Sequence, residues 1–185
     1  MVNLVTYYRA VAAPLLVLLL LEQQFSAFKW LLAVSFFTDA IDGWLARRFK
    51  VNSLLGARID SIADDLTVLV AILGVILYRP DFLRSEWLPA GIMAILYLIQ
   101  NGLALIRYHK LTGFHTYTAK LAAILQGAFL VLVFFLPQPV RPLFYLTACL
   151  TILDLAEEIL LVLILPEWEV NVKGLYWVLR RKRGL

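Results

Sequence analysis

Four aspartates occur at helical spacings within a strongly apolar sequence. Asp39 and Asp42 are three residues apart, and Asp60 and Asp64 are four residues apart. Each pair therefore shares one face of a helix. Carboxylates inside a membrane are costly and are usually retained for function, and four that converge repel one another unless a cation lies between them. The spacing predicts a divalent-metal site in a membrane enzyme.

Oxygen ligands of this kind select hard cations such as Mg²⁺, Mn²⁺ or Ca²⁺. Four carboxylates can hold two such ions, and a two-metal site suits displacement at phosphorus. Gly43 and Ala46 are small, so a ligand can approach the helix backbone beside Asp42. Arg47 supplies fixed positive charge for phosphate, and Gly56 leads into the next helix, whose N-terminus favours anionic groups.

The composition is that of a membrane protein. Of the 185 residues, 62% are hydrophobic, and the mean hydropathy is +0.83, whereas soluble domains are about half apolar. A membrane-spanning helix needs about 20 apolar residues. We therefore expect an all-α integral membrane protein, a single domain over residues 1–185, with six transmembrane helices. Their expected ranges are 4–22, 26–48, 57–78, 86–107, 116–136 and 142–165.

Basic residues predict how these helices are oriented. They concentrate in the second and fourth loops and in the C-terminal tail, which the positive-inside rule assigns to the cytoplasm. Both termini are then cytoplasmic, and the aspartates lie just below the cytoplasmic surface. An N-terminal segment before Pro14 is expected at the membrane interface, and the tail (about 167–185) is predicted to be a basic amphipathic anchor. This distribution accounts for the net charge of +4 with no nucleic-acid partner.

The aspartates belong to a longer pattern, D-x2-D-G-x2-A-R-x8-G-x3-D-x3-D, over residues 39–64. It resembles the signature of the CDP-alcohol phosphotransferases, also called CDP-alcohol phosphatidyltransferases, and every fixed position matches. The matching residues are Asp39, Asp42, Gly43, Ala46, Arg47, Gly56, Asp60 and Asp64. The six expected helices also agree with the architecture of this family, and the resemblance is strongest over residues 3–78.

The resemblance implies a transferase that moves a substituted phosphate from a CDP-linked donor to a small alcohol and releases CMP. An enzyme embedded in the membrane suits CDP-diacylglycerol as the donor, so that a phosphatidyl group is transferred; an archaeal-type lipid donor or a CDP-amino-alcohol stays open. The resemblance also implies that Asp39, Asp42 and Asp60 bind two divalent cations, Mg²⁺ or Mn²⁺, and that Asp64 is the general base and a further metal ligand. The other fixed positions would line the CDP site: Gly43, Ala46, Arg47 and Gly56. Family members are commonly homodimers, and we expect this one in a prokaryotic cytoplasmic membrane, with its active site facing the cytoplasm.

The acceptor alcohol is expected to bind in the second half of the chain. Candidate residues are Arg107, Lys110, His115 and Lys120, which could bind a phosphorylated alcohol; the alternative for Arg107 and Lys110 is a positive-inside loop. Residues 119–126 are similar to a G-K-x-x-T-x-x-Q string of phosphatidylglycerophosphate synthases. Lys120 and Gln126 are kept, and Ala replaces both Gly and Thr. Glycerol 3-phosphate is the first candidate acceptor, and inositol phosphate, inositol and serine stay open.

Three more acidic residues, Asp154, Glu157 and Glu158, lie in the sixth apolar segment. They are not expected to face lipid, and we predict buried pairing with basic groups or a contact in a dimer. A second metal or proton site is the alternative. A function of another class, a cation-coupled transporter that uses the intramembrane aspartates, predicts broken helices or repeats, and the sequence indicates neither.

Overall fold

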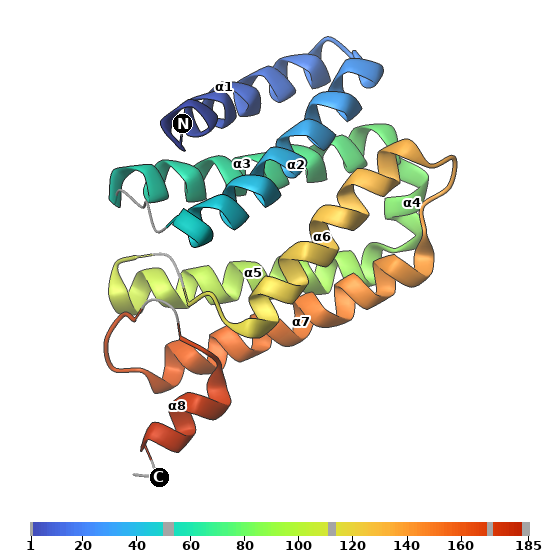
Figure 1. Cartoon of the computed structure of the whole chain (residues 1–185). Coiled ribbons are helices and arrows are strands. Elements are labelled where there is room, and N and C mark those ends of the chain that lie inside the picture. The colour runs from blue at the N-terminus through green and yellow to red at the C-terminus, as the bar shows by residue number, and fades with distance from the viewer. Residues whose placement is uncertain (1, 50–53, 111–113, 170–171, 183–185) are drawn as a thin grey trace. The chain divides into compact units, whose positions relative to one another are not determined.

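The computed structural model describes residues 2–49, 54–110, 114–169 and 172–182, and the side chains of residues 11–38, 66–110, 114–169 and 172–181. This part of the chain is helical and contains no strand (Figure 1). The helices are α1 (Val2–Leu21), α2 (Phe25–Phe49), α3 (Leu54–Tyr78), α4 (Pro80–Ser85), α5 (Trp87–Tyr108), α6 (Tyr117–Phe135), α7 (Arg141–Ile164) and α8 (Leu175–Lys182).

The six long helices agree with the six apolar segments expected from the sequence, and each bound lies within three residues of its predicted position. Pro142 lies in the first turn of α7, where proline is tolerated because it fits the first turn of a helix and not its continuation. Pro80 begins the short helix α4, which is not one of the six long helices. The short helix α4 was not predicted. The tail contains the helix α8 (Leu175–Lys182).

Two helices, α5 and α6, are long and apolar enough to cross a membrane by length and composition. Shorter apolar stretches occupy Val11–Leu21, Phe25–Thr38 and Leu66–Tyr78. Large apolar side chains on α5 and α6 are exposed, with Ile106 79% and Ile124 68% accessible. Exposed apolar surface of this kind marks contact with lipid or with another protein. An all-helical membrane protein is consistent with these features, while six spans and cytoplasmic termini stay predictions.

The helices form two compact units, each described here by itself. Unit 1 comprises Met1–Leu83 and Leu130–Pro139, and unit 2 comprises Arg84–Phe129 and Val140–Leu185. The chain passes from one unit to the other within α4 and within α6. A single domain over residues 1–185 stays a prediction.

Unit 1 has an apolar and aromatic core. Helix α1 contacts both α2 and α3, and α2 contacts α3. Leu16 of α1, Phe28 of α2 and Ala71 of α3 are fully buried. The Phe28 ring meets the Phe134 ring edge to face, with 5.3 Å between centroids, an arrangement that aromatic pairs prefer.

Gly74 of α3 makes this aromatic contact possible. A Cβ atom at position 74 would lie 2.7 Å from Cζ of Phe28 and 3.0 Å from Cζ of Phe134. Both distances are shorter than van der Waals contact, so only glycine lets the two rings approach the helix at this point.

Arg79 closes unit 1 at the end of α6. Its guanidinium donates hydrogen bonds to the carbonyl oxygens of Val133 (3.2 Å), Leu136 (2.7 Å) and Pro137 (3.0 Å). The last carbonyls of a helix have no partner within the helix, and a cation also interacts favourably with the helix dipole there. Arg79 therefore caps α6 from the end of α3.

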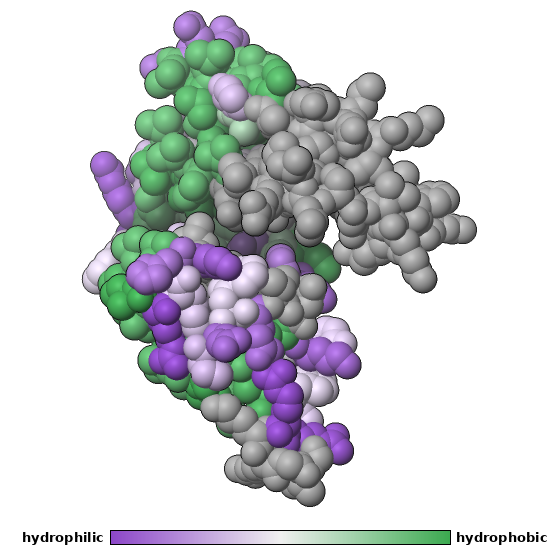
Figure 2. All heavy atoms as spheres, turned by 90° about the vertical axis from the view of Figure 1, so that its left-hand side faces the viewer, coloured by the Kyte–Doolittle hydropathy of each residue, from purple (hydrophilic) through white to green (hydrophobic). Residues whose placement is uncertain are grey.

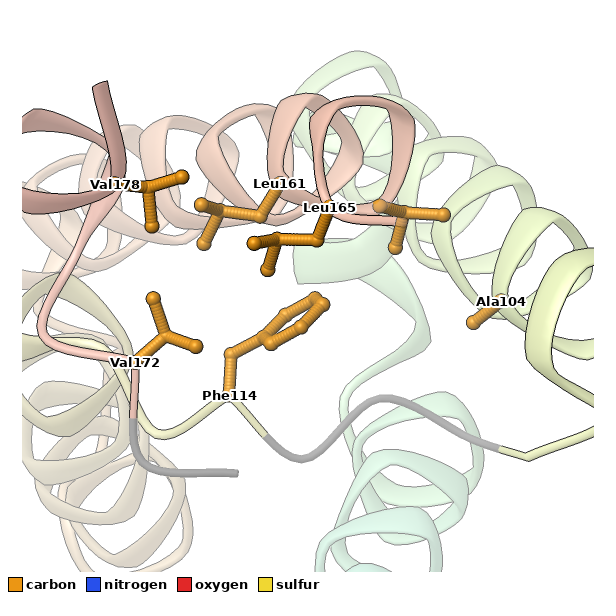
Figure 3. Close-up of a cluster of buried hydrophobic side chains, with 7 residues drawn as sticks. Ala104, Phe114, Leu161, Leu165, Val172 and Val178 are labelled. Carbon is orange, nitrogen blue, oxygen red and sulfur yellow. The ribbon is translucent and has the colours of Figure 1, made fainter. Parts of the chain in front are cut away.

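Unit 2 is built on α5 and α7, which pack against each other. Its core contains Ala104, Phe114, Leu161 and Leu165, all fully buried, together with Val162, Val172 and Val178. Figure 3 shows the Phe114 ring pointing toward Leu165, the residue that follows α7. The segment before α6 and the segment around α8 are thus held on α7 by apolar contacts.

Candidate functional site

The predicted metal ligands lie on two helices of unit 1. Asp39 and Asp42 lie in the second half of α2, and Asp60 and Asp64 lie in the first half of α3. Their side chains lie outside the described part of the structure, which gives the positions of these residues along the two helices. The helical backbone places each pair on one helix face, because residues three or four apart are neighbours.

The observed helix bounds set the distance of each aspartate from its helix end. Asp39 lies ten residues before Phe49, and Asp64 lies ten residues after Leu54; each is about 15 Å along its axis at 1.5 Å per residue. Asp42 and Asp60 are seven and six residues from the same two ends, or about 10 Å. Residues 50–53 join the ends, so Phe49 and Leu54 are at most about 18 Å apart.

The predicted CDP-binding residues share these two helix ends. Gly43, Ala46 and Arg47 lie on the last turns of α2, and Gly56 lies in the first turn of α3; their side chains also lie outside the described part. The first four N–H groups of a helix have no partner within it and can bind a phosphate. Gly56 has no side chain of its own that could cover the backbone of this turn.

The metal prediction depends on the aspartate positions alone. Among the residues whose side chains are described, no three His, Cys, Asp or Glu side chains come together as a possible metal site. The donor set at the four aspartates is entirely carboxylate, which fits Mg²⁺ or Mn²⁺ and not a site selective for zinc.

The candidate acceptor residues all lie in unit 2, and all four are exposed. Arg107 is in the last turn of α5, and Lys110 follows that helix, with Nζ 4.7 Å from the ring centroid of Trp168. His115 precedes α6 and has a positive φ of 52°. Lys120 is in the first turn of α6, with Nζ 5.5 Å from the ring centroid of Tyr117.

Hydrophilic side chains gather on this end of unit 2. Figure 2 views the molecule from the side on which α5 and α7 end, and purple residues cover part of unit 2 there. Arg107, Lys110, His115 and Lys120 contribute cations and an imidazole to this end. Exposed cations of this kind can bind a phosphorylated alcohol.

The three acidic residues of α7 have partners that the sequence did not predict. Asp154 accepts a hydrogen bond from Thr116 (3.1 Å), and Glu157 accepts one from Thr118 and another from the N–H of Leu175 (2.7 Å). These donors are neutral, and the predicted pairing with basic groups or contact in a dimer stays a prediction for Asp154 and Glu157. In the sequence, the only indication of these contacts is threonine or glycine near the start of a helix, and both residues are also common where no such contact forms.

Glu158 is buried, 8% accessible, and accepts a hydrogen bond from the side chain of Gln100, itself 3% accessible. Gln126, which matches the synthase string, donates to the hydroxyl of Thr151 (2.9 Å). Both glutamines therefore link helices within unit 2. For Gln126, this contact with α7 indicates a role in packing.

Comparisons with known proteins agree with the pattern over residues 39–64. The sequence profile of the CDP-alcohol phosphatidyltransferase family matches residues 1–163. A fusion protein of Schizosaccharomyces pombe, "cardiolipin synthase (CMP-forming) / mitochondrial hydrolase", is 28% identical over 117 residues, which cover 62% of this chain and 19% of that protein.

A second relative is a phosphatidylcholine synthase of Legionella pneumophila, 37% identical over 62 residues, which cover 31% of this chain and 24% of the relative. The chain thus matches less than a quarter of the length of either relative. No solved structure matches it significantly.

Proposed function

The chain belongs to the CDP-alcohol phosphatidyltransferase family, and we propose that it transfers a phosphatidyl group from CDP-diacylglycerol to a small alcohol with release of CMP. The relatives bear the names of phospholipid synthases, which supports a role in phospholipid synthesis. These matches cover only part of each relative, so the proposed reaction depends on the residues of this chain.

One observation carries the proposal: two aspartate pairs lie at equal distances from two helix ends that are joined by a short connection. Asp39 and Asp64 are each about 15 Å from their helix ends, and Asp42 and Asp60 about 10 Å. If the two contacting helices run antiparallel, these distances place all four aspartates at a similar height along the helix axes. A metal site built from both pairs requires this.

The donor set suits two divalent cations, held by Asp39, Asp42, Asp60 and Asp64. When bound, such ions would neutralise the diphosphate and stabilise charge on the leaving phosphate. Arg47 would add a fixed positive charge beside the diphosphate. Gly43, Ala46 and Gly56 would leave space for the CDP group against the helix backbone.

Asp64 is the proposed general base. It would take the proton from the acceptor hydroxyl as that oxygen attacks the phosphorus that carries the diacylglycerol. The new P–O bond forms as the bond to the bridging diphosphate oxygen breaks, and that oxygen leaves with its electron pair on CMP. The proton stays on Asp64 until solvent removes it.

Glycerol 3-phosphate is the proposed acceptor, with inositol phosphate, inositol and serine as alternatives. The support is the group of exposed residues on unit 2: Arg107, Lys110, His115 and Lys120. A phosphorylated acceptor brings two negative charges that such residues can bind. Inositol and serine carry no phosphate, so they would gain less from the same cations.

The setting we propose is a prokaryotic cytoplasmic membrane, with six spans, cytoplasmic termini and the active site open to the cytoplasm. The distribution of basic residues supports this orientation. The exposed apolar residues of α5 and α6 support contact with lipid. A homodimer is proposed from the family resemblance alone, and cross-linking in native membranes tests it.

CMP release by the purified protein in mixed micelles tests the reaction. CDP-diacylglycerol and Mg²⁺ or Mn²⁺ are supplied with one acceptor at a time: glycerol 3-phosphate, inositol 3-phosphate, inositol or serine. We expect release with glycerol 3-phosphate, and a loss of at least about 100-fold in Asp64→Asn, because general-base catalysis contributes that much. Asp65→Asn is the matched control, since position 65 is about 100° away around the helix.

The outcomes separate the parts of the proposal. Release with another acceptor alone would retain the reaction and correct the alcohol. Equal losses in Asp64→Asn and Asp65→Asn would remove the role given to Asp64. A folded protein that does not bind CDP would contradict the site itself.

A further inference from the structure

Glu157 of α7 connects three segments of unit 2. Its carboxylate accepts hydrogen bonds from the hydroxyl of Thr118, at the start of α6, and from the N–H of Leu175, at the start of α8 (2.7 Å). The N–H groups at a helix start have no partner within the helix, and an anion there also interacts favourably with the helix dipole. Glu157 therefore caps α8 from a neighbouring helix while it holds the first turn of α6.

Gly174 shows that this cap is tightly built. It has a φ of +148°, and a Cβ atom there would lie 2.9 Å from Oε1 of Glu157. Positive φ and close approach both favour glycine. The backbone before α8 thus fits around the carboxylate of Glu157.

The start of α6 is fixed from two sides. Thr116 is the N-cap residue: its hydroxyl oxygen accepts the N–H of Ala119 (3.0 Å) and donates to Asp154 (3.1 Å). The N–H of Tyr117 donates to the carbonyl oxygen of Lys173, just before α8 (3.4 Å). Thr116 itself is fully buried. Asp154, Glu157 and the segment before α8 together set the position of residues 116–118.

Two candidate acceptor residues flank this fixed segment. His115 immediately precedes Thr116, and Lys120 follows Thr118 by two residues; both are exposed. His115 has a left-handed backbone, φ 52°, which non-glycine residues adopt only where their surroundings enforce it. The direction of both residues therefore depends on the hydrogen bonds of residues 116 and 118.

We infer that Glu157 is a positioning residue for the alcohol acceptor, acting through Thr118 and the start of α8 on the segment that carries His115 and Lys120. The inference rests on the proposed function, because it assigns these two residues to the acceptor. It also gives the C-terminal segment a role in acceptor binding: the start of α8 supplies part of the frame.

Two variants, Thr118→Val and Glu157→Gln, test the inference, and each has a control. Thr118→Val keeps the shape of the side chain and removes its hydroxyl, whereas Thr118→Ser keeps the hydroxyl. Glu157→Gln keeps the size of the side chain but removes its charge and one of its two acceptor oxygens, so the charge-assisted hydrogen bonds with Thr118 and Leu175 are weakened. Glu86→Gln is the control, since Glu86 is also a buried acid of unit 2 that accepts a hydrogen bond from a hydroxyl, that of Tyr145 (2.8 Å); it differs from Glu157 in an ion pair with Arg141 (3.6 Å).

KM for acceptor and for CDP-diacylglycerol is measured for each variant, with thermal unfolding in parallel. We expect the acceptor KM to rise about five- to tenfold in Thr118→Val and Glu157→Gln, the effect of about one hydrogen bond. The donor KM should stay within twofold of wild type, and Thr118→Ser and Glu86→Gln should keep both values. The effect of the double variant should be smaller than the two single effects combined, because both changes affect the contact between Thr118 and Glu157.

A parallel rise of donor and acceptor KM, or an unchanged acceptor KM in an active enzyme, would overturn the positioning role alone. A wild type that releases no CMP with any acceptor would overturn the proposed function, and this inference with it. If Glu157→Gln does not fold, the Thr118→Val and Thr118→Ser pair decides the question.

Discussion

The two units use acidic residues in different ways. In unit 2, the described acids of α7 lie within the fold: Asp154 and Glu157 accept hydrogen bonds from threonine hydroxyls, and Glu158 accepts one from Gln100. In unit 1, the described core is apolar and aromatic, with Phe28 against Phe134. The acids of the family pattern lie on α2 and α3 of that unit.

We expect this difference to separate acids that hold the fold from acids that take part in the reaction. An acid that has protein donors holds the segments that it contacts, so its removal should affect stability or, as proposed for Glu157, the position of neighbouring residues. The four aspartates of the family pattern lie at similar distances from the joined ends of α2 and α3. Such an arrangement suits the binding of a cation, so removal of these acids should affect the reaction. The predictions below test that separation, from the largest expected effect to the smallest.

The largest effect is expected for the metal ligands. Chelation of divalent cations should abolish CMP release, and Mg²⁺ or Mn²⁺ should restore it. Asp60→Asn should lower the rate by more than about 100-fold, because a metal contributes several kcal/mol to the transition state. Titration of Mn²⁺ by activity, and by the thermal stabilisation that it produces, checks both statements.

Glu158→Gln is the matched control for Asp60→Asn, since it removes one carboxylate charge from a buried position that has a protein donor. Its metal requirement should equal that of wild type. If Glu158→Gln shifted the metal titration as far as Asp60→Asn does, the separation between the two kinds of acid would be wrong.

A moderate effect on stability is expected at Glu158. Glu158→Leu would leave the buried amide of Gln100 without this acceptor, and an unsatisfied buried group costs about 1–3 kcal/mol. Thermal unfolding in detergent should show this loss, and the rate per folded molecule should be unchanged. Glu158→Gln should lose less, because its carbonyl oxygen can still accept the hydrogen bond.

Unit 1 offers a test of packing at Gly74. Gly74→Ala places a methyl group 2.7 Å from the Phe28 ring, and overpacking costs about 1–3 kcal/mol, against a gain in helix propensity of about 1 kcal/mol. We expect a small net loss of stability. Gly102→Ala is the matched control, because nothing lies within 4 Å of its added Cβ; it should be neutral or stabilising. Equal melting temperatures for the two variants would contradict the packing described for unit 1.

The sequence predicted the helices well because apolar runs and prolines are local signals. Pro80 and Pro142 suit the turns between apolar segments, and the structure places them in the first turns of α4 and α7. The positions of the family pattern could also be placed in advance, since spacing along a helix fixes the shared face. The helical conformation of α4 was missed, because six residues with a mixed composition give no periodic signal.

The partners of the α7 acids could not be predicted, since they depend on which segments meet in space. Thr116 and Thr118 precede α7 by more than 20 residues, and Leu175 follows it by about ten. Nothing in the local sequence indicates that these three donors converge on Asp154 and Glu157. An acid in an apolar segment was expected to have a charged partner, whereas the hydrogen bonds observed come from hydroxyl and backbone N–H groups.

The smallest effect is expected for an acid that does have a basic partner. Glu169 accepts two hydrogen bonds from Arg181 of α8, at 2.7 and 3.1 Å, on an exposed surface. The hydrogen bond and charge of Glu169 raise the pKa of Arg181, so the contribution of this group is complete at neutral pH and is lost only in strongly alkaline solution. Exposed ion pairs contribute little to stability because water and salt screen them.

Glu169→Gln should therefore unfold at the same temperature as wild type at pH 7, in low salt and in high salt. Thermal unfolding beside Glu158→Leu gives the comparison directly, since both changes remove one carboxylate from unit 2. A loss in Glu169→Gln as large as that in Glu158→Leu would mean that charge pairing, and not burial with a neutral donor, decides which acids stabilise this unit. We expect the larger loss of stability from the buried acid, Glu158, whose hydrogen-bond donor is neutral, and the smaller loss from the exposed acid, Glu169, whose partner is a cation.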